Sequence, residues 1–392
     1  MNNKRFKIVA DDKIPFLKGV LEPFVDIVFL PGAKISAVDV ADADAIFTRT
    51  RTCCNKALLH RSRVRLIVTA TIGYDHIDTG YCEANEIRWV NAPGCNSTSV
   101  QQYLTAALLV AAKEKELNLQ DMTLGIIGVG NVGSKVAKAA TALGMRVLLN
   151  DPPRAEKESD AQFISLNSLL EQSDIVSCHT PLTKEGPYPT RHLSSHDFFN
   201  QMKDGALYIN TSRGEVTDSI ALRQAAITKL SGYILDVWEG EPHLNLALLE
   251  NALIATPHIA GYSSDGKANG TAVCVREFCK FFGLDVLPEW YPNNVPPPPM
   301  PVVIQINCEG KTEQQVYFEA VTHTYPIWAD SDRLKISPES FEEQRGGYWI
   351  RREFGNFTVQ LQNPTAKIID NLSKLGFKIS PFGGGAGGDP KK

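Results

Sequence analysis

The sequence has no long uninterrupted hydrophobic run and no excess of positive charge. No stretch reaches the about 20 apolar residues of a membrane-spanning helix. The first residues, MNNKRFKIVADD, lead into a strand-like segment without the apolar run of a signal peptide. A net charge of −4 provides no overall basic field for nucleic acid. We therefore expect a cytoplasmic protein whose partners include neither membrane nor nucleic acid.

Paired cysteine motifs are also lacking. The eight cysteines are scattered, without a C-x-x-C pair and without the Cys/His spacing of a zinc site. We therefore expect reduced, buried thiols and no metal. The cysteines are Cys53, Cys54, Cys82, Cys95, Cys178, Cys274, Cys279 and Cys308.

What is present is a glycine motif within residues 124–151, LGIIGVGNVGSKVAKAATALGMRVLLND. The pattern predicts a strand, a tight turn, a helix and a second strand. Gly128, Gly130 and Gly133 have the G-x-G-x-x-G spacing that lets the backbone approach a pyrophosphate at a helix N-terminus. Asp151 ends the second strand, close to the distance of about 20 residues at which an acid binds the adenine ribose. This segment therefore predicts binding of NAD rather than NADP.

The length of 392 residues predicts more than one domain. Short apolar runs alternate with helical segments, which is typical of a parallel sheet covered by helices. We expect an α/β fold in which residues 97–265 form a Rossmann-type, doubly wound NAD-binding domain of six or seven strands. Residues 1–96 and 266–290 would form a flavodoxin-like α/β substrate domain.

The C-terminal part has a different character. The segment NNVPPPPMP, residues 293–301, indicates a stiff linker. We expect residues 291–380 to form a small α+β domain, with charged and aromatic patches and no obvious site, whose simplest interpretation is oligomerisation or regulation. The low-complexity tail, residues 381–392, is expected to be disordered.

Three polar residues follow predicted strands of the second domain, at the edge where doubly wound sheets bind ligands. Arg213 lies in TSRGE, Glu241 in DVWEGEP and His258 in TPHIAG. A guanidinium holds a carboxylate bidentately, and an imidazole oriented by a carboxylate exchanges a proton with a hydroxyl near neutral pH. Each residue alone could be a surface ion pair, a loop charge or a core histidine. Together, on a dinucleotide fold, they indicate a functional site.

The motifs GVGNVG, TSRGE, DVWEGEP and TPHIAGY resemble those of the D-2-hydroxyacid dehydrogenase family, over about residues 6–285. A narrower resemblance is carried by ATIGYDHID, NAPGCNS, NDPPR, HTPLTKEGPY and DVWEGEPHLN, followed by the extra C-terminal domain. These motifs resemble those of the branch of the family that oxidises 4-phospho-D-erythronate with NAD in vitamin B6 biosynthesis. The resemblance implies this phosphorylated 2-hydroxy acid as substrate, and a homodimer formed through the C-terminal domain.

The resemblance also implies roles for individual residues. Arg213 would bind the substrate carboxylate, His258 would transfer the proton, and Glu241 would be the partner of His258. The implied substrate contacts are Thr50, Thr71 and Tyr262, with Thr50 standing where a serine is expected. The implied cofactor contacts, including the glycine motif, are Gly128, Gly130, Asn131, Val132, Gly133, Asp151, Thr180, Thr211, Ser212, Arg213, Asp236 and Gly261.

Some alternatives stay open at this point. The substrate could be another small D-2-hydroxy acid, such as 3-phosphoglycerate or glycerate. An NAD-sensing corepressor scaffold is an alternative of a different class, because such scaffolds share the fold and retain the catalytic residues. A substrate phosphate would need cationic groups, for which Arg49 and Arg51 beside Thr50 are candidates. Arg154 is a weaker candidate, because it follows the cofactor acid and could simply cover the adenosine.

Overall fold

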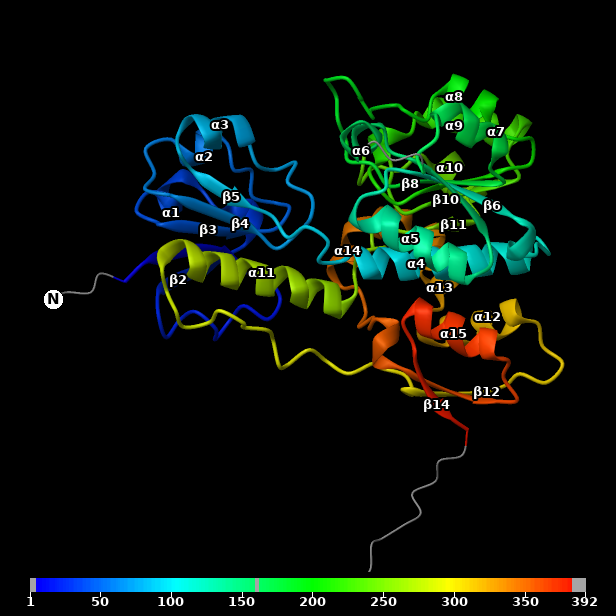
Figure 1. Ribbon diagram of the computed structural model, residues 1–392. Helices are drawn as coiled ribbons and strands as arrows, with labels where there is room; N and C mark the ends of the chain where they lie inside the picture. The colour runs from blue at the N-terminus through cyan, green and yellow to red at the C-terminus, as the bar shows by residue number, and fades with distance from the viewer. Residues whose placement is uncertain (1–4, 159–161, 383–392) are drawn as a thin grey trace, which may run out of the picture. The chain divides into compact units, whose positions relative to one another are not determined.

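The structure is a computed structural model that describes residues 5–158 and 162–382 (Figure 1). The chain divides into two compact units. The first unit comprises residues 1–96 and 263–297, and the second comprises residues 97–262 and 298–392. Most of the tail expected to be disordered, from residue 383 onward, lies outside the described residues. Within the described ranges, no helix has the length and apolar character needed to cross a membrane.

The first unit is built on a parallel sheet with strand order β2-β1-β3-β4-β5, the flavodoxin-like order. Its strands are β1 Lys7–Asp11, β2 Asp26–Leu30, β3 Ala45–Thr48, β4 Leu66–Thr69 and β5 Arg88–Val90. Its helices are α1 Ala37–Val40, α2 Lys56–Leu59, α3 Thr79–Ala84 and α11 Ser264–Phe282. Successive residues of β1 enter different cores, Ile8 with Phe278 of α11 and Val9 with Leu58 of α2. Hydrophobic cores on both faces explain why these strands are continuously apolar.

The second unit contains a six-stranded parallel sheet with strand order β11-β10-β9-β8-β6-β7. Its strands are β6 Thr123–Ile127, β7 Arg146–Asn150, β8 Ile175–Cys178, β9 Leu207–Asn210, β10 Gly232–Leu235 and β11 Ile254–Ala255. From β6 the chain first builds outward to β7, and from β8 to β11 it builds the other way. Ligands bind at this reversal of strand order in doubly wound folds.

Helices flank this sheet along the whole segment. They are α4 Ser97–Glu114, α5 Asn131–Ala142, α6 Pro152–Glu158, α7 Leu166–Gln172, α8 His196–Gln201, α9 Ser219–Thr228 and α10 Leu246–Asn251. Helix α4 is buried around most of its circumference because it packs on both α5 and α12. This explains why its sequence is rich in Ala and Leu on every face. Short 3₁₀ turns occur at Gly32–Lys34, Leu119–Asp121, Gly214–Val216, Pro338–Ser340 and Phe354–Asn356.

The C-terminal part forms a third, three-stranded sheet with strand order β12-β13-β14. Its elements are β12 Val303–Asn307, α12 Glu313–Thr324, α13 Ile327–Ile336, α14 Phe341–Gly346, β13 Thr358–Gln362, α15 Ala366–Leu375 and β14 Lys378–Pro381. The predicted α/β fold class is confirmed, but this part differs from the α+β arrangement we expected. All three strands are parallel, because each connection between them is helical and returns the chain to the same end.

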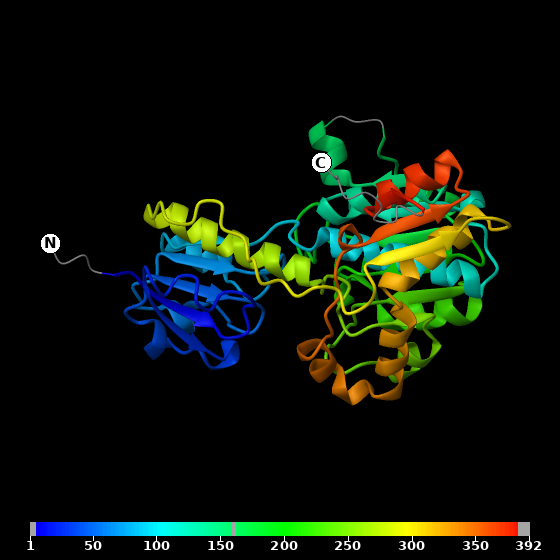
Figure 2. The same ribbon diagram turned by 90° about the horizontal axis from the view of Figure 1, so that it is seen from below.

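The C-terminal sheet and the dinucleotide-binding segment share one hydrophobic core. Ile304 and Val359 of the small sheet belong to the same buried cluster as Leu108 of α4 and Val136 of α5. Figures 1 and 2 show α12 and α15 packed on the α4 side of the large sheet. The C-terminal part is therefore an integral part of the second unit, and its residues can reach the loops of the large sheet.

Candidate active site

The glycine motif forms the turn between β6 and α5. Gly128 has φ +84°, in the left-handed region that favours glycine. A Cβ on Gly133 would lie 2.1 Å from the Gly128 carbonyl oxygen, so the third glycine allows the helix to pack on the turn. A Cβ on Gly130, the N-cap residue of α5, would meet no atom of the described residues within 4 Å. The backbone of Gly130, followed by Asn131 and Val132, therefore borders open space suited to a bound diphosphate.

Asp151 lies directly against this turn. One carboxylate oxygen accepts a hydrogen bond from Val129 N (2.8 Å) and the other accepts one from Arg154 N (3.1 Å). Arg154 in turn donates to the Val129 carbonyl oxygen (2.6 Å) and pairs with Glu158 (2.7 Å). The acid and the glycine turn are thus held together. Arg154 contacts the same turn through the Val129 carbonyl oxygen.

Thr180 provides an independent sign that this edge of the sheet fits a ligand. It follows β8, and its side chain lies next to Gly128, since a Cβ on that glycine would come within 3.0 Å of Thr180 Cγ2. The buried Thr180 Oγ1 has no hydrogen-bond partner among the described residues. A buried hydroxyl without a partner is costly, which is resolved if a ligand supplies one. The residues at the switch point therefore fit a dinucleotide.

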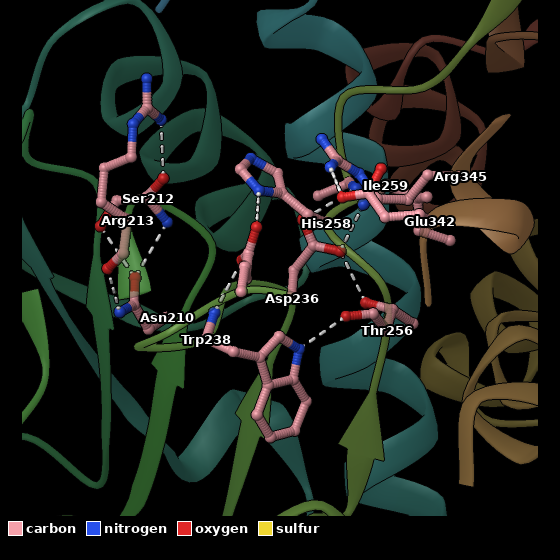
Figure 3. A network of polar contacts seen from close by, with 12 residues as sticks. Asn210, Ser212, Arg213, Asp236, Trp238, Thr256, His258, Ile259, Glu342 and Arg345 are labelled. Carbon is pink, nitrogen blue, oxygen red and sulfur yellow. Dashed lines mark hydrogen bonds and ion pairs between the residues drawn. The ribbon is translucent and has the colours of Figure 1, made fainter. Parts of the chain in front are cut away.

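His258, on the loop after β11, and Glu241, on the loop after the neighbouring strand β10, form a hydrogen-bonded pair (Figure 3). His258 Nδ1 lies 2.8 Å from Glu241 Oε2, and Glu241 Oε1 accepts the Trp238 N–H at 2.9 Å. Burial raises the pKa of Glu241, but the hydrogen bonds from His258 and Trp238 and the charge of His258 outweigh it, so the net pKa is lowered. Glu241 is therefore ionised at neutral pH. The His258 side chain is 32% exposed and so remains accessible from outside the fold.

The loop that carries His258 is wrapped around Asp236, at the end of β10. The Asp236 carboxylate accepts hydrogen bonds from Ile259 N (2.8 Å), Ala260 N (2.9 Å) and Thr256 Oγ1 (2.7 Å). His258 N donates to the Asp236 carbonyl oxygen (2.7 Å), and His258 itself has φ 56°. Burial raises the pKa of Asp236, which these hydrogen bonds and the charge of His258 partly offset. Asp236 thus fixes the backbone that orients the imidazole. Gly261 continues the same loop.

Arg213 lies on the loop after β9, which Asn210 organises. The Asn210 amide oxygen accepts hydrogen bonds from Ser212 N (2.9 Å) and Oγ (2.8 Å), and its nitrogen donates to the Arg213 carbonyl oxygen (2.9 Å). A Cβ on Gly214 would lie 2.0 Å from the carbonyl carbon and oxygen of Trp238. The Arg213 loop therefore touches the backbone of the loop that carries Glu241. Figure 3 shows Arg213 and His258 on loops at the same edge of the sheet.

Thr211 on that loop lies beside the residue that follows β8. Its hydroxyl is 3.4 Å from His179 Nδ1, and His179 Nε2 is 3.0 Å from Ser177 Oγ. Burial lowers the pKa of His179 to about 4, so this imidazole is neutral at physiological pH. The loops after β8 and β9 are thereby linked, which brings Thr180, Thr211 and Ser212 to the same edge.

Two of the expected substrate contacts belong to the first unit. The Thr71 hydroxyl bonds the Thr69 hydroxyl (2.7 Å) and donates to the Gly73 carbonyl oxygen (2.9 Å). Thr69, at the end of β4, is paired in register with Thr48, two residues before the exposed Thr50. Both threonines therefore lie at the carboxyl edge of that sheet. The third contact, Tyr262, belongs to the second unit.

Residues 291–380 carry no site that is obvious from the sequence, yet two arginines from this part contact the loop after His258. Arg351, 3% exposed, donates to the Ala260 carbonyl oxygen (2.5 Å). Arg345 donates to the Tyr262 hydroxyl (3.2 Å). The sequence feature that could have pointed to these contacts is the high density of arginine and aromatic residues in RGGYWIRREF. The sequence around this segment does not show which part of the chain it contacts.

Metal ligands and thiols do not add to the site. Within the described parts of the chain, His, Cys, Asp and Glu form no group of three or more that could hold a metal ion. The eight cysteines are free thiols, of which Cys53 is exposed and the others are buried.

Comparison with known proteins adds the family. Residues 99–260 match the NAD-binding domain of the D-isomer specific 2-hydroxyacid dehydrogenases. A protein of Bacteroides fragilis named erythronate-4-phosphate dehydrogenase is 46% identical over 355 residues, which cover 90% of this chain and 99% of the relative. The chain belongs to the D-2-hydroxyacid dehydrogenase family. The family predicted from the motifs is therefore confirmed, and with it the NAD cofactor and the dehydrogenase class.

Other D-2-hydroxyacid dehydrogenases place the chain more closely. A relative with the same name from Proteus mirabilis is 38% identical over 382 residues, 95% of this chain and 99% of its own length. The narrower resemblance is confirmed too, since these matches extend through the C-terminal part. Among solved structures, D-lactate dehydrogenase from Aquifex aeolicus, complexed with NAD and lactic acid, has a TM-score of 0.59 and 29% identity. It covers 71% of this chain and 96% of its own.

Proposed function

We propose that the protein oxidises 4-phospho-D-erythronate at C2 with NAD, giving (R)-3-hydroxy-2-oxo-4-phosphooxybutanoate on the route to pyridoxal 5′-phosphate. The observation that carries the proposal is the match of nearly the whole chain, the C-terminal part included, to relatives named erythronate-4-phosphate dehydrogenase. The His258–Glu241 pair, which lies at the same carboxyl edge of the parallel sheet as the glycine turn, supports the same reaction type.

In this proposal His258 is the group that exchanges the proton. Its Nδ1–H donates to Glu241, which leaves the Nε2 lone pair to accept the proton of the C2 hydroxyl. Glu241, ionised because its pKa is lowered, stabilises the imidazolium that forms. NAD, when bound, accepts the hydride that leaves C2. Asp236 keeps His258 in place through the backbone of residues 259 and 260.

Arg213 is proposed to bind the substrate carboxylate, because a guanidinium fork matches that group. Thr50, Thr71 and Tyr262 are the proposed hydroxyl contacts to the rest of the substrate. The proposed cofactor contacts are the glycine turn with Asn131 and Val132, then Asp151, Thr180, Thr211, Ser212, Asp236 and Gly261. The unpartnered Thr180 hydroxyl and the open side of Gly130 support this assignment.

The family resemblance extends the proposal to assembly and domain roles. Residues 1–96 and 266–290 are proposed to bind the substrate, and residues 97–265 to bind NAD. Residues 291–380 are proposed to join two copies into a homodimer, which light scattering of the purified protein tests. A cytoplasmic location is also part of this proposal, and fractionation of cells tests it.

The test of the substrate is NADH formation with 4-phospho-D-erythronate, D-3-phosphoglycerate, D-glycerate and unphosphorylated D-erythronate side by side. A carbonyl trap is included because oxidation of a 2-hydroxy acid is uphill. We expect a strong preference for 4-phospho-D-erythronate. Better turnover of another acid would replace the proposed substrate but keep the reaction type. Binding of NAD without turnover of any acid would instead favour a scaffold.

A further inference from the structure

Arg345 is held in a defined position by the helix that carries it. Helix α14 begins with Phe341, which is 1% exposed and lies in the same hydrophobic cluster as Trp238 of the Glu241 loop. Arg345 follows one turn later, so it projects from the same side of the helix. Its guanidinium carbon lies 5.8 Å from the ring centroid of Tyr262 and 5.6 Å from that of Phe341. The position of the Arg345 side chain is thus fixed by its packing against the protein.

The guanidinium of Arg345 has an N–H donor that makes no hydrogen bond within the described residues. It carries five N–H donors. One nitrogen donates to the Tyr262 hydroxyl (3.2 Å) and another contacts Glu342 Oε1 (3.2 Å). The Arg345 Nε–H is buried and has no partner within the described residues, although the side chain as a whole is 15% exposed. A buried cation with unused donors is the arrangement expected where an anionic ligand completes the site.

Arg345 also lies within electrostatic reach of the His258–Glu241 pair. Its positive charge contributes to the lowered pKa of Glu241. Figure 3 shows its side chain entering the polar network from the C-terminal part, on the His258 side. The neighbouring Arg351 also has a buried nitrogen without a partner in the described residues, Nη1, but it is only 3% exposed and donates to the Ala260 carbonyl oxygen, so it is less accessible to a substrate than Arg345.

We propose that Arg345 is a substrate-binding residue that holds the second anionic group of the substrate, its phosphate. This inference rests on the proposed function, in which the substrate carries a carboxylate and a phosphate and Arg213 takes the carboxylate. Arg345 then gives the C-terminal part a direct share in substrate selection. It also explains how a dehydrogenase of this family would favour a phosphorylated acid over its unphosphorylated form.

The test compares two substrates in one variant. Arg345→Met keeps an unbranched apolar side chain at this position and removes the guanidinium that lies over Tyr262 and Phe341, and with it the charge. We expect kcat/KM for 4-phospho-D-erythronate to fall about 10- to 100-fold, chiefly through KM, the loss that one or two charge-assisted hydrogen bonds explain. For unphosphorylated D-erythronate it should stay within about twofold. Equal losses on both substrates would overturn the proposal, because they would mean that Arg345 only positions Tyr262.

The ratio of the two kcat/KM values does not depend on the fraction of folded enzyme, so partial unfolding of the variant does not obscure the result. Arg345→Lys keeps the charge and should recover part of the preference for the phosphorylated acid. The matched control is Arg223→Met, which removes an exposed arginine on α9 and should leave the ratio unchanged.

Binding of inorganic phosphate, measured by calorimetry on the NADH-bound protein, separates this proposal from the proposed function. Weaker phosphate binding in Arg345→Met, with no turnover of 4-phospho-D-erythronate by the unmodified protein, would refute the proposed function and keep the phosphate site. Normal turnover by the unmodified protein, with phosphate binding and kinetics unchanged in Arg345→Met, would refute the site and keep the function.

Discussion

Replacing Glu241 by glutamine tests the catalytic pair with a change of one atom. Glu241 accepts two hydrogen bonds, one from Trp238 N (2.9 Å) and one from His258 Nδ1 (2.8 Å). A glutamine side chain has only one oxygen. The backbone N–H of Trp238 can only donate, so it takes that oxygen, and the glutamine NH₂ then faces His258 Nδ1.

The consequence is a change of tautomer. His258 Nδ1 must accept the hydrogen bond from Gln, which moves the imidazole proton to Nε2, the atom proposed to receive the proton of the substrate hydroxyl. The opposite orientation of the amide would set its NH₂ against the Trp238 N–H, at a cost of about 1–3 kcal/mol. We therefore expect kcat for oxidation to fall about 10²–10⁴-fold. Loss of general base catalysis and the Asp→Asn change in a Ser-His-Asp triad have effects of this size.

The chain supplies a matched control on the same loop. Glu239 also pairs with a histidine, His192 (2.6 Å), and also accepts a backbone N–H, from Ser219 (3.3 Å). Glu239→Gln should keep kcat within about twofold, because His192 is not proposed to exchange a proton with substrate. The assay is steady-state NADH formation with 4-phospho-D-erythronate, with NADH affinity measured alongside. The reasoning is refuted if Glu241→Gln keeps about a third or more of the kcat, or if Glu239→Gln loses as much.

Three further predictions concern the cofactor edge. Gly130→Ala should leave the melting temperature unchanged, because its Cβ meets no described atom within 4 Å, but it should weaken NAD binding, because that Cβ enters the space proposed for the diphosphate. Gly133→Ala should lower the melting temperature, because its Cβ would lie 2.1 Å from the Gly128 carbonyl oxygen. Equal effects of the two variants on the melting temperature would contradict this. Asp151→Ser should raise kcat/KM with NADP relative to NAD, and an unchanged ratio would show that Asp151 does not set the preference. Burial lowers the pKa of His179 from 6.5 to about 4, so between these pH values the unfolded chain binds more protons than the folded one. Stability that is present above pH 6.5 is therefore lost as the pH falls towards 4. His179→Gln should reduce the dependence of the melting temperature on pH in this range, and an unchanged dependence would argue against this role of His179.

Much of the second unit was predictable because its information is local. The spacing of Gly128, Gly130 and Gly133 and the acid at Asp151 specify a turn, a helix and a strand within thirty or so consecutive residues. The carboxyl ends of parallel strands meet at one edge, so Arg213, Glu241 and His258 could be expected together before any distance was known. The structure brings Glu241 and His258 within hydrogen-bonding distance.

The C-terminal contribution was not predictable for the opposite reason. Arg345 and Arg351 reach the loop at Ala260 and Tyr262 across about 80–90 positions of sequence, and that contact depends on how two parts of the chain pack. The parallel order of β12, β13 and β14 was missed as well, because the hydropathy pattern shows strands and helices but not the direction in which strands pair. The role of Asp236, whose carboxylate binds the backbone of the loop that carries His258, likewise could not be predicted without the fold.

Transfer of a label from the substrate to the cofactor tests the central claim most directly. 4-Phospho-D-erythronate carrying deuterium at C2 is incubated with the protein, NAD and a carbonyl trap, and the reduced cofactor is examined by mass spectrometry. Our account predicts that the reduced cofactor carries one deuterium, and that His258→Gln forms it far more slowly. Reduced cofactor without the label, or none at all while another 2-hydroxy acid transfers its C2 deuterium, would contradict the account.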